Sequence, residues 1–127
     1  MQLLPHFRNA VVPIEKVRDY ALDPEHPIGK HKATVFEAAL GFRHEHSDVV
    51  ARVIKASLSR APAVRGAQDQ HGEKWVTYHE MIGANGRTAV VTVAWIFRAQ
   101  RPTEPVLISC YIEGQGKRKL TEAQNTP

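Results

Sequence analysis

The hydrophobic pattern of the chain changes its period about halfway along. In the first half, apolar residues recur every three or four positions, the spacing of a helix buried on one side. In the second half, several segments alternate apolar and polar residues, the spacing of a strand with one buried face. The pattern therefore predicts an α+β fold in which two to three N-terminal helices pack on one face of a three- to four-stranded antiparallel sheet.

Three segments of the first half predict helices. The first, residues 14–22, ends at Asp23-Pro24, because the residue before a proline is pushed out of the helical region. The second spans residues 29–41 and ends at a glycine, which suits the left-handed residue that terminates many helices. The third, residues 49–60, follows the capping pair Ser47-Asp48.

The second half predicts an antiparallel meander. Residues 74–82 alternate and are rich in aromatic and β-branched side chains, and the Asn85-Gly86 pair that follows is typical of a hairpin turn. Residues 87–98 are almost continuously apolar, which favours a central strand, and residues 106–112 predict the last strand. The other segments are expected to be a loop at 64–72, a connection at 101–105 and a short edge strand at 9–12.

Length and composition indicate an ordinary globular protein. The 127 residues suffice for a single domain, with a core at about residues 9–113 and a solvated basic tail at 114–127. The net charge of +4 favours anionic partners. Because the sequence has neither an apolar run of the ~18 residues that a membrane span needs nor a secretion signal, we expect no membrane association and a cytoplasmic protein.

Several kinds of site are not indicated by the sequence. The seven histidines include no His-Glu-x-x-His pair and no Cys/His ladder, so no metal is predicted. The glycine-containing segment 83–86 has no lysine where a nucleotide-binding phosphate loop needs one. The sequence also has no G-x-S-x-G pattern, which would mark the nucleophile of a serine hydrolase. The single cysteine, Cys110, rules out an internal disulfide and lies in an apolar strand, which indicates an inert buried thiol. No cofactor is expected.

The start of the second predicted helix has an unusual charge. Two imidazoles, His26 and His31, and two ammonium groups, Lys30 and Lys32, lie around its first turn. The helix macrodipole disfavours positive charge at that end. A bound anion such as phosphate would offset the conflict, so the segment indicates phosphate or nucleic acid as a ligand.

The residue types present can cleave RNA without a metal. That reaction needs a base for the 2′-hydroxyl proton, an acid for the leaving oxygen, and cations around the phosphorane. Imidazoles suit both proton transfers near neutral pH, and sheet hydroxyls can orient the scissile group. The catalytic candidates are His26, His31, Lys32, Thr92 and Tyr111, and the candidates for substrate binding are Lys30, Arg43 and Ser109.

Each of these residues also has a purely structural interpretation. The ring of His26 can cap a backbone group in a turn, and His31 can be a half-buried core histidine one turn before Val35. One of Lys30 and Lys32 is expected to be only a solvated charge. The two tryptophans are interpreted as core residues rather than platforms for stacked bases.

Residues 17–33, together with Phe36 and Gly41-Phe42, resemble a family of small uncharacterised bacterial domains whose pattern is close to R-D-Y-x-L-x-x-x-H-P-x-G-x-H-K-A. The turn at 83–86 and the strands at 92–95 and 107–111 extend the likeness to about residues 10–112. The family is similar in layout to the barnase–EndoU–colicin–RelE group of metal-independent ribonucleases. Its members look like parts of toxin–antitoxin or polymorphic-toxin loci.

The resemblance implies a metal-independent endoribonuclease toxin, with RNA as its substrate and a cognate antitoxin or immunity protein as its partner. The motif positions present here are His26, His31 and Lys32. The alternative is a non-catalytic binding module, either immunity- or antitoxin-like or an adaptor, that docks a small partner protein. In that case both histidine rings would hydrogen-bond to the backbone.

Overall fold

The computed structural model describes residues 1–113. Two helices of eleven residues form the N-terminal half, α2 (Lys30–Leu40) and α3 (Ser47–Ser57). The shorter elements are the 3₁₀ turns Phe7–Asn9 and His44–His46, the helix α1 (Ile14–Lys16) and a one-turn π-helix at Val17–Ala21. The C-terminal half is one antiparallel sheet in the order β1-β2-β3-β4, built from β1 (Ala63–Asp69), β2 (Gly72–Ile82), β3 (Thr88–Arg98) and β4 (Arg101–Tyr111). The predicted α+β class is confirmed.

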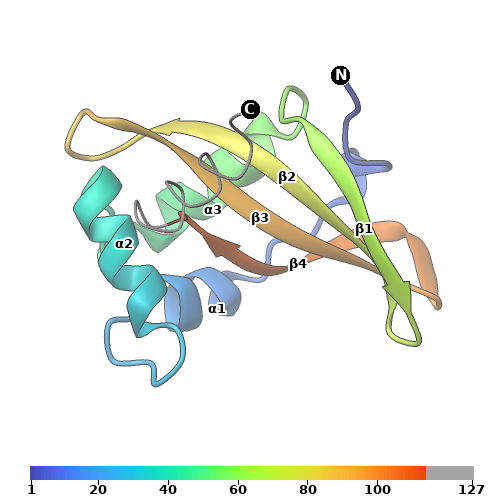
Figure 1. Cartoon of the computed structure of the whole chain (residues 1–127), viewed down its shortest axis with the longest axis horizontal. Helices are drawn as coiled ribbons and strands as arrows, with labels where there is room; N and C mark the ends of the chain where they lie inside the picture. The colour runs from blue at the N-terminus through green and yellow to red at the C-terminus, as the bar shows by residue number, and fades with distance from the viewer. Residues whose placement is uncertain (114–127) are drawn as a thin grey trace, which may run out of the picture.

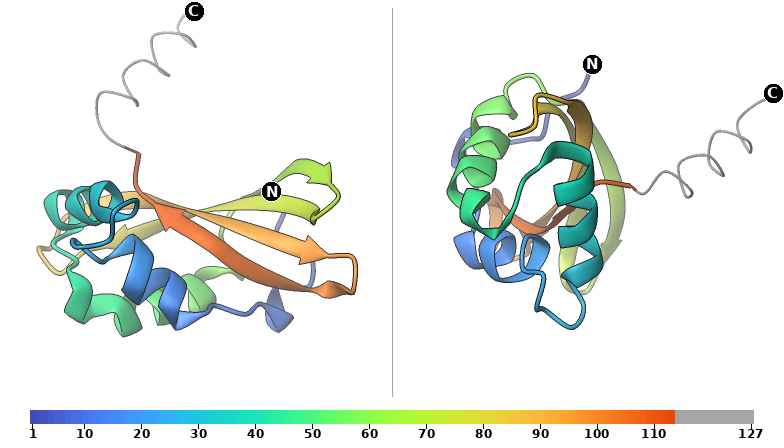
Figure 2. Two further views of the ribbon diagram at one scale, coloured as in Figure 1. Left: turned by 90° about the horizontal axis from the view of Figure 1, so that it is seen from below. Right: turned by 90° about the vertical axis from the view of Figure 1, so that its left-hand side faces the viewer.

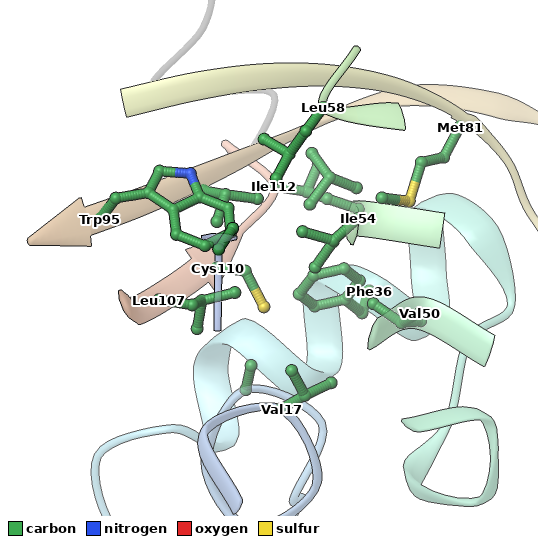
Figure 3. Packing of buried hydrophobic residues seen from close by; sticks show 14 of the residues in the cluster. Val17, Phe36, Val50, Ile54, Leu58, Met81, Trp95, Leu107, Cys110 and Ile112 are labelled. Carbon is green, nitrogen blue, oxygen red and sulfur yellow. The ribbon is translucent and has the colours of Figure 1, made fainter. Parts of the chain in front are cut away.

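Within residues 1–113, the helices cover one face of the sheet, and none of them lies on the other face (Figures 1 and 2). Strands β2 and β3 each alternate between the two faces, which are called here the inner face, toward the helices, and the outer face. Trp95 and Met81 point inward and are buried with Phe36 of α2 and Ile54 of α3 (Figure 3). Burial of such large apolar side chains, each worth about 1.5–3 kcal/mol, stabilises the two-layer arrangement.

The hairpin between β2 and β3 terminates α2. Gly41 has φ 68°, the left-handed conformation predicted for the helix end, and the Asn85 N–H donates to the Leu40 carbonyl at 3.2 Å. A Cβ on Gly83 would run into that same carbonyl oxygen. The glycines of the turn therefore let the sheet approach the end of the helix closely, which fixes α2 beside the sheet.

Two predicted connections are strands. Residues 64–72, expected to be a loop, form most of β1, and the expected connection at 101–105 is the beginning of β4. Strand β1 was missed because it is an edge strand with only Ala63 buried, so it shows no apolar alternation. The beginning of β4 was missed because it contains two prolines, which an edge strand tolerates.

The N-terminal segment also differs from the prediction. The expected helix at 14–22 is a single α-turn followed by the π-helix, and the expected strand at 9–12 is one parallel bridge between Val11 and Val106. Leu4 is 1% exposed, so packing begins earlier than residue 9. The expected tail at 114–127 lies outside the described residues. Within residues 1–113, no helix is long and apolar enough to cross a membrane.

Candidate functional site

Lys32 is the centre of a polar cluster at the edge of β4. Its ammonium group donates to the Ser109 hydroxyl at 2.9 Å and to the Tyr20 hydroxyl at 3.3 Å. The same nitrogen lies 4.6 Å from the ring centroid of Tyr20 and 5.6 Å from that of Tyr111. No carboxylate within residues 1–113 forms an ion pair with it. Hydroxyls and aromatic faces thus hold a half-buried positive charge without neutralising it.

His26 is connected to Lys32 through Tyr20. Its ring lies edge-on to the Tyr20 ring, with centroids 4.8 Å apart. Its Nδ1 accepts hydrogen bonds from the backbone N–H groups of Ile28, at 3.0 Å, and Gly29, at 2.9 Å. The neutral ring therefore carries its proton on Nε2, which leaves that nitrogen for an external partner. Below, the Lys32 cluster denotes Tyr20, His26, Lys32, Ser109 and Tyr111.

Gly29 makes this arrangement possible. A Cβ at this position would overlap the backbone carbonyl of Tyr20. A glycine is therefore required where the loop that carries His26 packs on the π-helix that carries Tyr20. The spacing of the His-Pro-x-Gly segment thus has a structural cause, because it holds the imidazole against the tyrosine.

Thr92 and Tyr111 are direct neighbours on the outer face of the sheet. They are opposite each other in the β3–β4 register, and Tyr78 of β2 is opposite Thr92 on its other side. Burial raises the pKa of Tyr111, and the negative charge of Glu113 and the neighbouring Tyr78 raise it further. The Tyr111 hydroxyl therefore stays protonated near neutral pH and serves as a hydrogen-bond donor.

Three of the predicted site residues lie apart from the cluster. His31 and Lys30 are exposed, and neither side chain hydrogen-bonds to any residue that the structure describes. Arg43 lies past the far end of α2, a helix that rises about 16 Å, and its guanidinium is 3.4 Å from the Glu37 carboxylate. The interpretation of His31 as a half-buried core residue is wrong, whereas the interpretation of His26 as a backbone cap is confirmed.

Comparison with known proteins shows which family the chain belongs to. Residues 3–114 match a family described as a domain of unknown function, DUF6883. The chain belongs to this family. No curated protein sequence matches it. Among solved structures, one chain of a contact-dependent growth inhibition toxin–immunity protein complex from Klebsiella pneumoniae 342 is similar, with 15% identity over 86% of this chain and 97% of that chain, and a TM-score of 0.56. Such a distant likeness shows a shared fold.

This DUF6883 domain holds a second polar cluster that sequence analysis missed. The Trp95 indole donates to the Thr77 hydroxyl at 2.8 Å, which lies 2.7 Å from His79 Nε2, and His79 Nδ1 lies 2.6 Å from the Ser57 hydroxyl. The Ser57 hydroxyl donates in turn to the Val53 carbonyl. All four hydrogen bonds can form at once if each group donates to the next, from the Trp95 indole through Thr77, His79 and Ser57 to the Val53 carbonyl. We call these residues, Ser57, Thr77, His79 and Trp95, the His79 chain.

Neither the His79 chain nor the cysteine of the DUF6883 domain has the properties of a reactive group. Burial lowers the pKa of His79 from 6.5 to about 4, with a contribution from the charge of Arg60, so the ring is neutral at physiological pH. Burial raises the pKa of the Cys110 thiol to about 12, and the predicted inert thiol is confirmed as buried. Residues 1–113 contain no cluster of three metal-ligating side chains.

Sequence analysis also missed Tyr20, which joins the two candidate side chains of the Lys32 cluster. The available signal was its place in the pattern that begins R-D-Y, six residues before His26 and twelve before Lys32. That spacing alone did not indicate contact, because Asp23-Pro24 separates the two segments and the intervening loop reverses the chain.

Proposed function

We propose that this domain is a metal-independent endoribonuclease toxin of a toxin–antitoxin or polymorphic-toxin system. The main support is the ammonium group of Lys32, which has no ion-pair partner within residues 1–113 and is held by the hydroxyls of Ser109 and Tyr20 beside the ring of Tyr111. A phosphodiester supplies the negative charge and the acceptor oxygens that this arrangement lacks. RNA also supplies the internal nucleophile, its 2′-hydroxyl, so the reaction needs no metal-bound water.

In the proposed reaction, the 2′-hydroxyl attacks the adjacent phosphorus and the bond to the 5′-oxygen breaks. A base removes the 2′-hydroxyl proton, an acid protonates the leaving 5′-oxygen, and the products are a 2′,3′-cyclic phosphate and a 5′-hydroxyl end. Of the two candidate histidines, His31 is assigned to the base, and the leaving oxygen takes its proton from water. His26, whose Nδ1 accepts two backbone N–H groups, presents Nε2–H and donates a hydrogen bond to the phosphate. Lys32 stabilises the charge of the phosphorane.

The other predicted residues have supporting roles. Tyr111 and Thr92, neighbours across β3 and β4, orient the scissile group through their hydroxyls. Ser109 positions Lys32 and contacts the phosphate. Lys30 and Arg43, both exposed, attract the RNA through long-range electrostatics rather than through the chemical step.

The solved relative supports the same setting. That structure is a toxin–immunity protein complex for contact-dependent growth inhibition, and this domain shares the fold of one of its chains. A role as either toxin or immunity protein fits that similarity, and the Lys32 cluster favours the toxin. The partner would then be a cognate immunity protein or antitoxin, and the site of action the cytoplasm, where the RNA is.

The alternative, a non-catalytic binding module, has one observation in its favour. His26 Nδ1 accepts two backbone N–H groups, as expected of a structural clasp. In such a module, the ammonium group of Lys32 would bind a carboxylate of the partner protein instead of a phosphate.

The deciding experiment is incubation of the purified protein with total RNA in the presence of a chelator. We expect RNA fragments that end in 2′,3′-cyclic phosphate, and growth arrest when the protein is expressed. A Lys32→Met variant should be inactive but folded, and a Lys30→Met variant, which removes an exposed charge two residues away, should stay active. Intact RNA with the wild-type protein would reject the ribonuclease and favour the binding module.

A further inference from the structure

A negatively charged side chain, Glu113, lies next to the Lys32 cluster, two residues after Tyr111. Ser109 and Tyr111 are two residues apart in β4, so their side chains share one face of the strand about 7 Å apart. Glu113 follows just past the end of β4 and lines a recess with Thr92, the neighbour of Tyr111. Lys32 is bonded to Ser109 and lies over the ring of Tyr111, so Ser109, Tyr111 and Glu113 form a row with Lys32 at one end and Glu113 at the other. A positive and a negative group therefore flank Tyr111.

A small recess lies at the negative end of this row. It has a volume of about 100 Å³ and is lined by Tyr78, Val90, Thr92, Ile112 and Glu113. The Tyr78 side chain is 39% exposed, so its ring is accessible from solvent, whereas Thr92 is 5% exposed and lies deeper. The recess thus combines an aromatic surface, two aliphatic side chains and one carboxylate that accepts hydrogen bonds.

We propose that this recess binds one unpaired base of the RNA strand, with the adjoining phosphate at Lys32, and that it prefers bases with an exocyclic amine over uracil. This inference rests on the proposed function. The carboxylate of Glu113 accepts hydrogen bonds from an amine such as N4 of cytosine or N6 of adenine. Uracil presents a carbonyl oxygen at the equivalent position, and two acceptors facing each other repel.

The arrangement selects a single strand. In a duplex the Watson–Crick edge of a base is paired and its faces are stacked, so neither Glu113 nor the ring of Tyr78 could reach it. An unpaired base can stack on a tyrosine, a contact that tolerates any base. Tyr78 would therefore supply affinity, and Glu113 would supply discrimination.

The two charges also determine which end of this surface holds the base and which end holds the phosphate. A phosphate placed in the recess would be repelled by Glu113, whereas at the other end of the row it meets the ammonium group of Lys32. Glu113 lines the recess with Thr92, which is opposite Tyr111 in the β3–β4 register, so the carboxylate lies close to this part of the surface. Base and phosphate therefore cannot exchange places without losing both interactions.

The test is the affinity of the full chain for labelled 2′-O-methyl tetranucleotides of adenosine, cytidine or uridine, measured by fluorescence anisotropy. These oligomers lack the 2′-hydroxyl nucleophile, so the protein cannot cleave them during the measurement. We expect wild-type protein to bind the adenosine and cytidine oligomers about tenfold more tightly than the uridine oligomer. In Glu113→Gln this ratio should fall to about one, because the new amide can donate to the uracil carbonyl. Tyr78→Ala should weaken binding of all three about tenfold without changing their ratios.

Glu80→Gln is the matched control. Glu80 is an exposed carboxylate of β2, two residues from Tyr78 and on the same face, but it does not line the recess. Its replacement removes the same charge and should leave the adenosine-to-uridine ratio unchanged. Equal wild-type affinities, no detectable binding, or the same change in both variants would each overturn the inference, provided that circular dichroism shows folded proteins.

The two proposals can fail separately. A wild-type protein that prefers adenosine and cytidine oligomers but leaves total RNA intact would reject the ribonuclease and retain the base recess. A protein that cleaves RNA with no preference among the oligomers would retain the ribonuclease and reject the recess.

Discussion

The Lys32 cluster and the His79 chain are built from similar residues and differ in how fully their hydrogen bonds are satisfied. Both combine a basic side chain, hydroxyls and an aromatic ring. In the His79 chain, the imidazole is 1% exposed and both of its nitrogens have partners. In the Lys32 cluster, two hydroxyls account for two of the three ammonium donors, and the residue is only partly buried.

The difference indicates which cluster can act on a ligand. A saturated and enclosed polar chain fixes the packing of α3 on β2 and has no capacity left for an external group. A partly buried cation with a remaining donor can still bind an anion. Histidine and hydroxyl groups near each other are therefore a weak indication of chemistry, and the unsatisfied donor is the stronger one.

Lys32→Met should have the largest effect on activity. Methionine preserves most of the aliphatic volume between the two tyrosines but removes the charge at the phosphate. We expect the specific rate of RNA cleavage to fall by about 10³-fold, equivalent to about 4 kcal/mol of transition-state stabilisation, with little change in melting temperature. A variant that keeps more than about a tenth of the wild-type rate would show that Lys32 does not serve the reaction.

The His79 chain should make stability depend on pH. Because the pKa of His79 is about 4 in the folded protein, below its ordinary value of 6.5, the unfolded state binds more protons between those two values. Stability is therefore complete above about pH 6.5 and falls as the pH drops toward 4, by about 3 kcal/mol. The measurement is urea unfolding at several pH values in wild type and His79→Gln.

The comparison with His79→Gln is necessary because carboxylates also titrate in the lower part of this range. Only the difference between the two proteins reports on the imidazole. The same pH dependence in both would show that His79 does not titrate abnormally.

Thr77→Val tests the same chain at its centre. The substitution keeps the shape of the side chain but leaves the Trp95 indole N–H and His79 Nε2 without their partner. We expect a loss of about 2 kcal/mol in the free energy of unfolding. RNA cleavage below the melting temperature should be unchanged, the reverse of the result for Lys32→Met. A loss of activity without a loss of stability would connect the two clusters.

Much of the fold could be predicted because its signals are local. The left-handed Gly41, the Asn85-Gly86 turn and the periodicity of α3 each need only neighbouring residues. Strand β1 could not be predicted, since its place at the sheet edge depends on pairing with β2 and leaves no apolar alternation in its own sequence. The π-helix was missed because its apolar spacing does not differ visibly from that of an α-helix.

The candidate site was predictable only in part. The motif identified His26 and Lys32, whose segment has a local sequence signature. The contact between Lys32 and Ser109 joins residues 77 positions apart, and which hydroxyls of β4 Lys32 can reach depends on strand register. The His79 chain joins Ser57 to His79, 22 positions away, so no local pattern indicates it.

Lys30→Met should have the smallest effect and separates local from long-range electrostatics. Lys30 is exposed, so its charge attracts RNA only through solvent that salt screens. We expect kcat/KM to fall by no more than about threefold at about 0.01 M ionic strength, and the difference from wild type to disappear at about 0.15 M. The defect of Lys32→Met should persist at both ionic strengths, because its donor acts in direct contact. If Lys30→Met matched Lys32→Met in size and salt dependence, the two lysines would contribute only general positive charge, and the distinction drawn from burial and hydrogen bonding would fail.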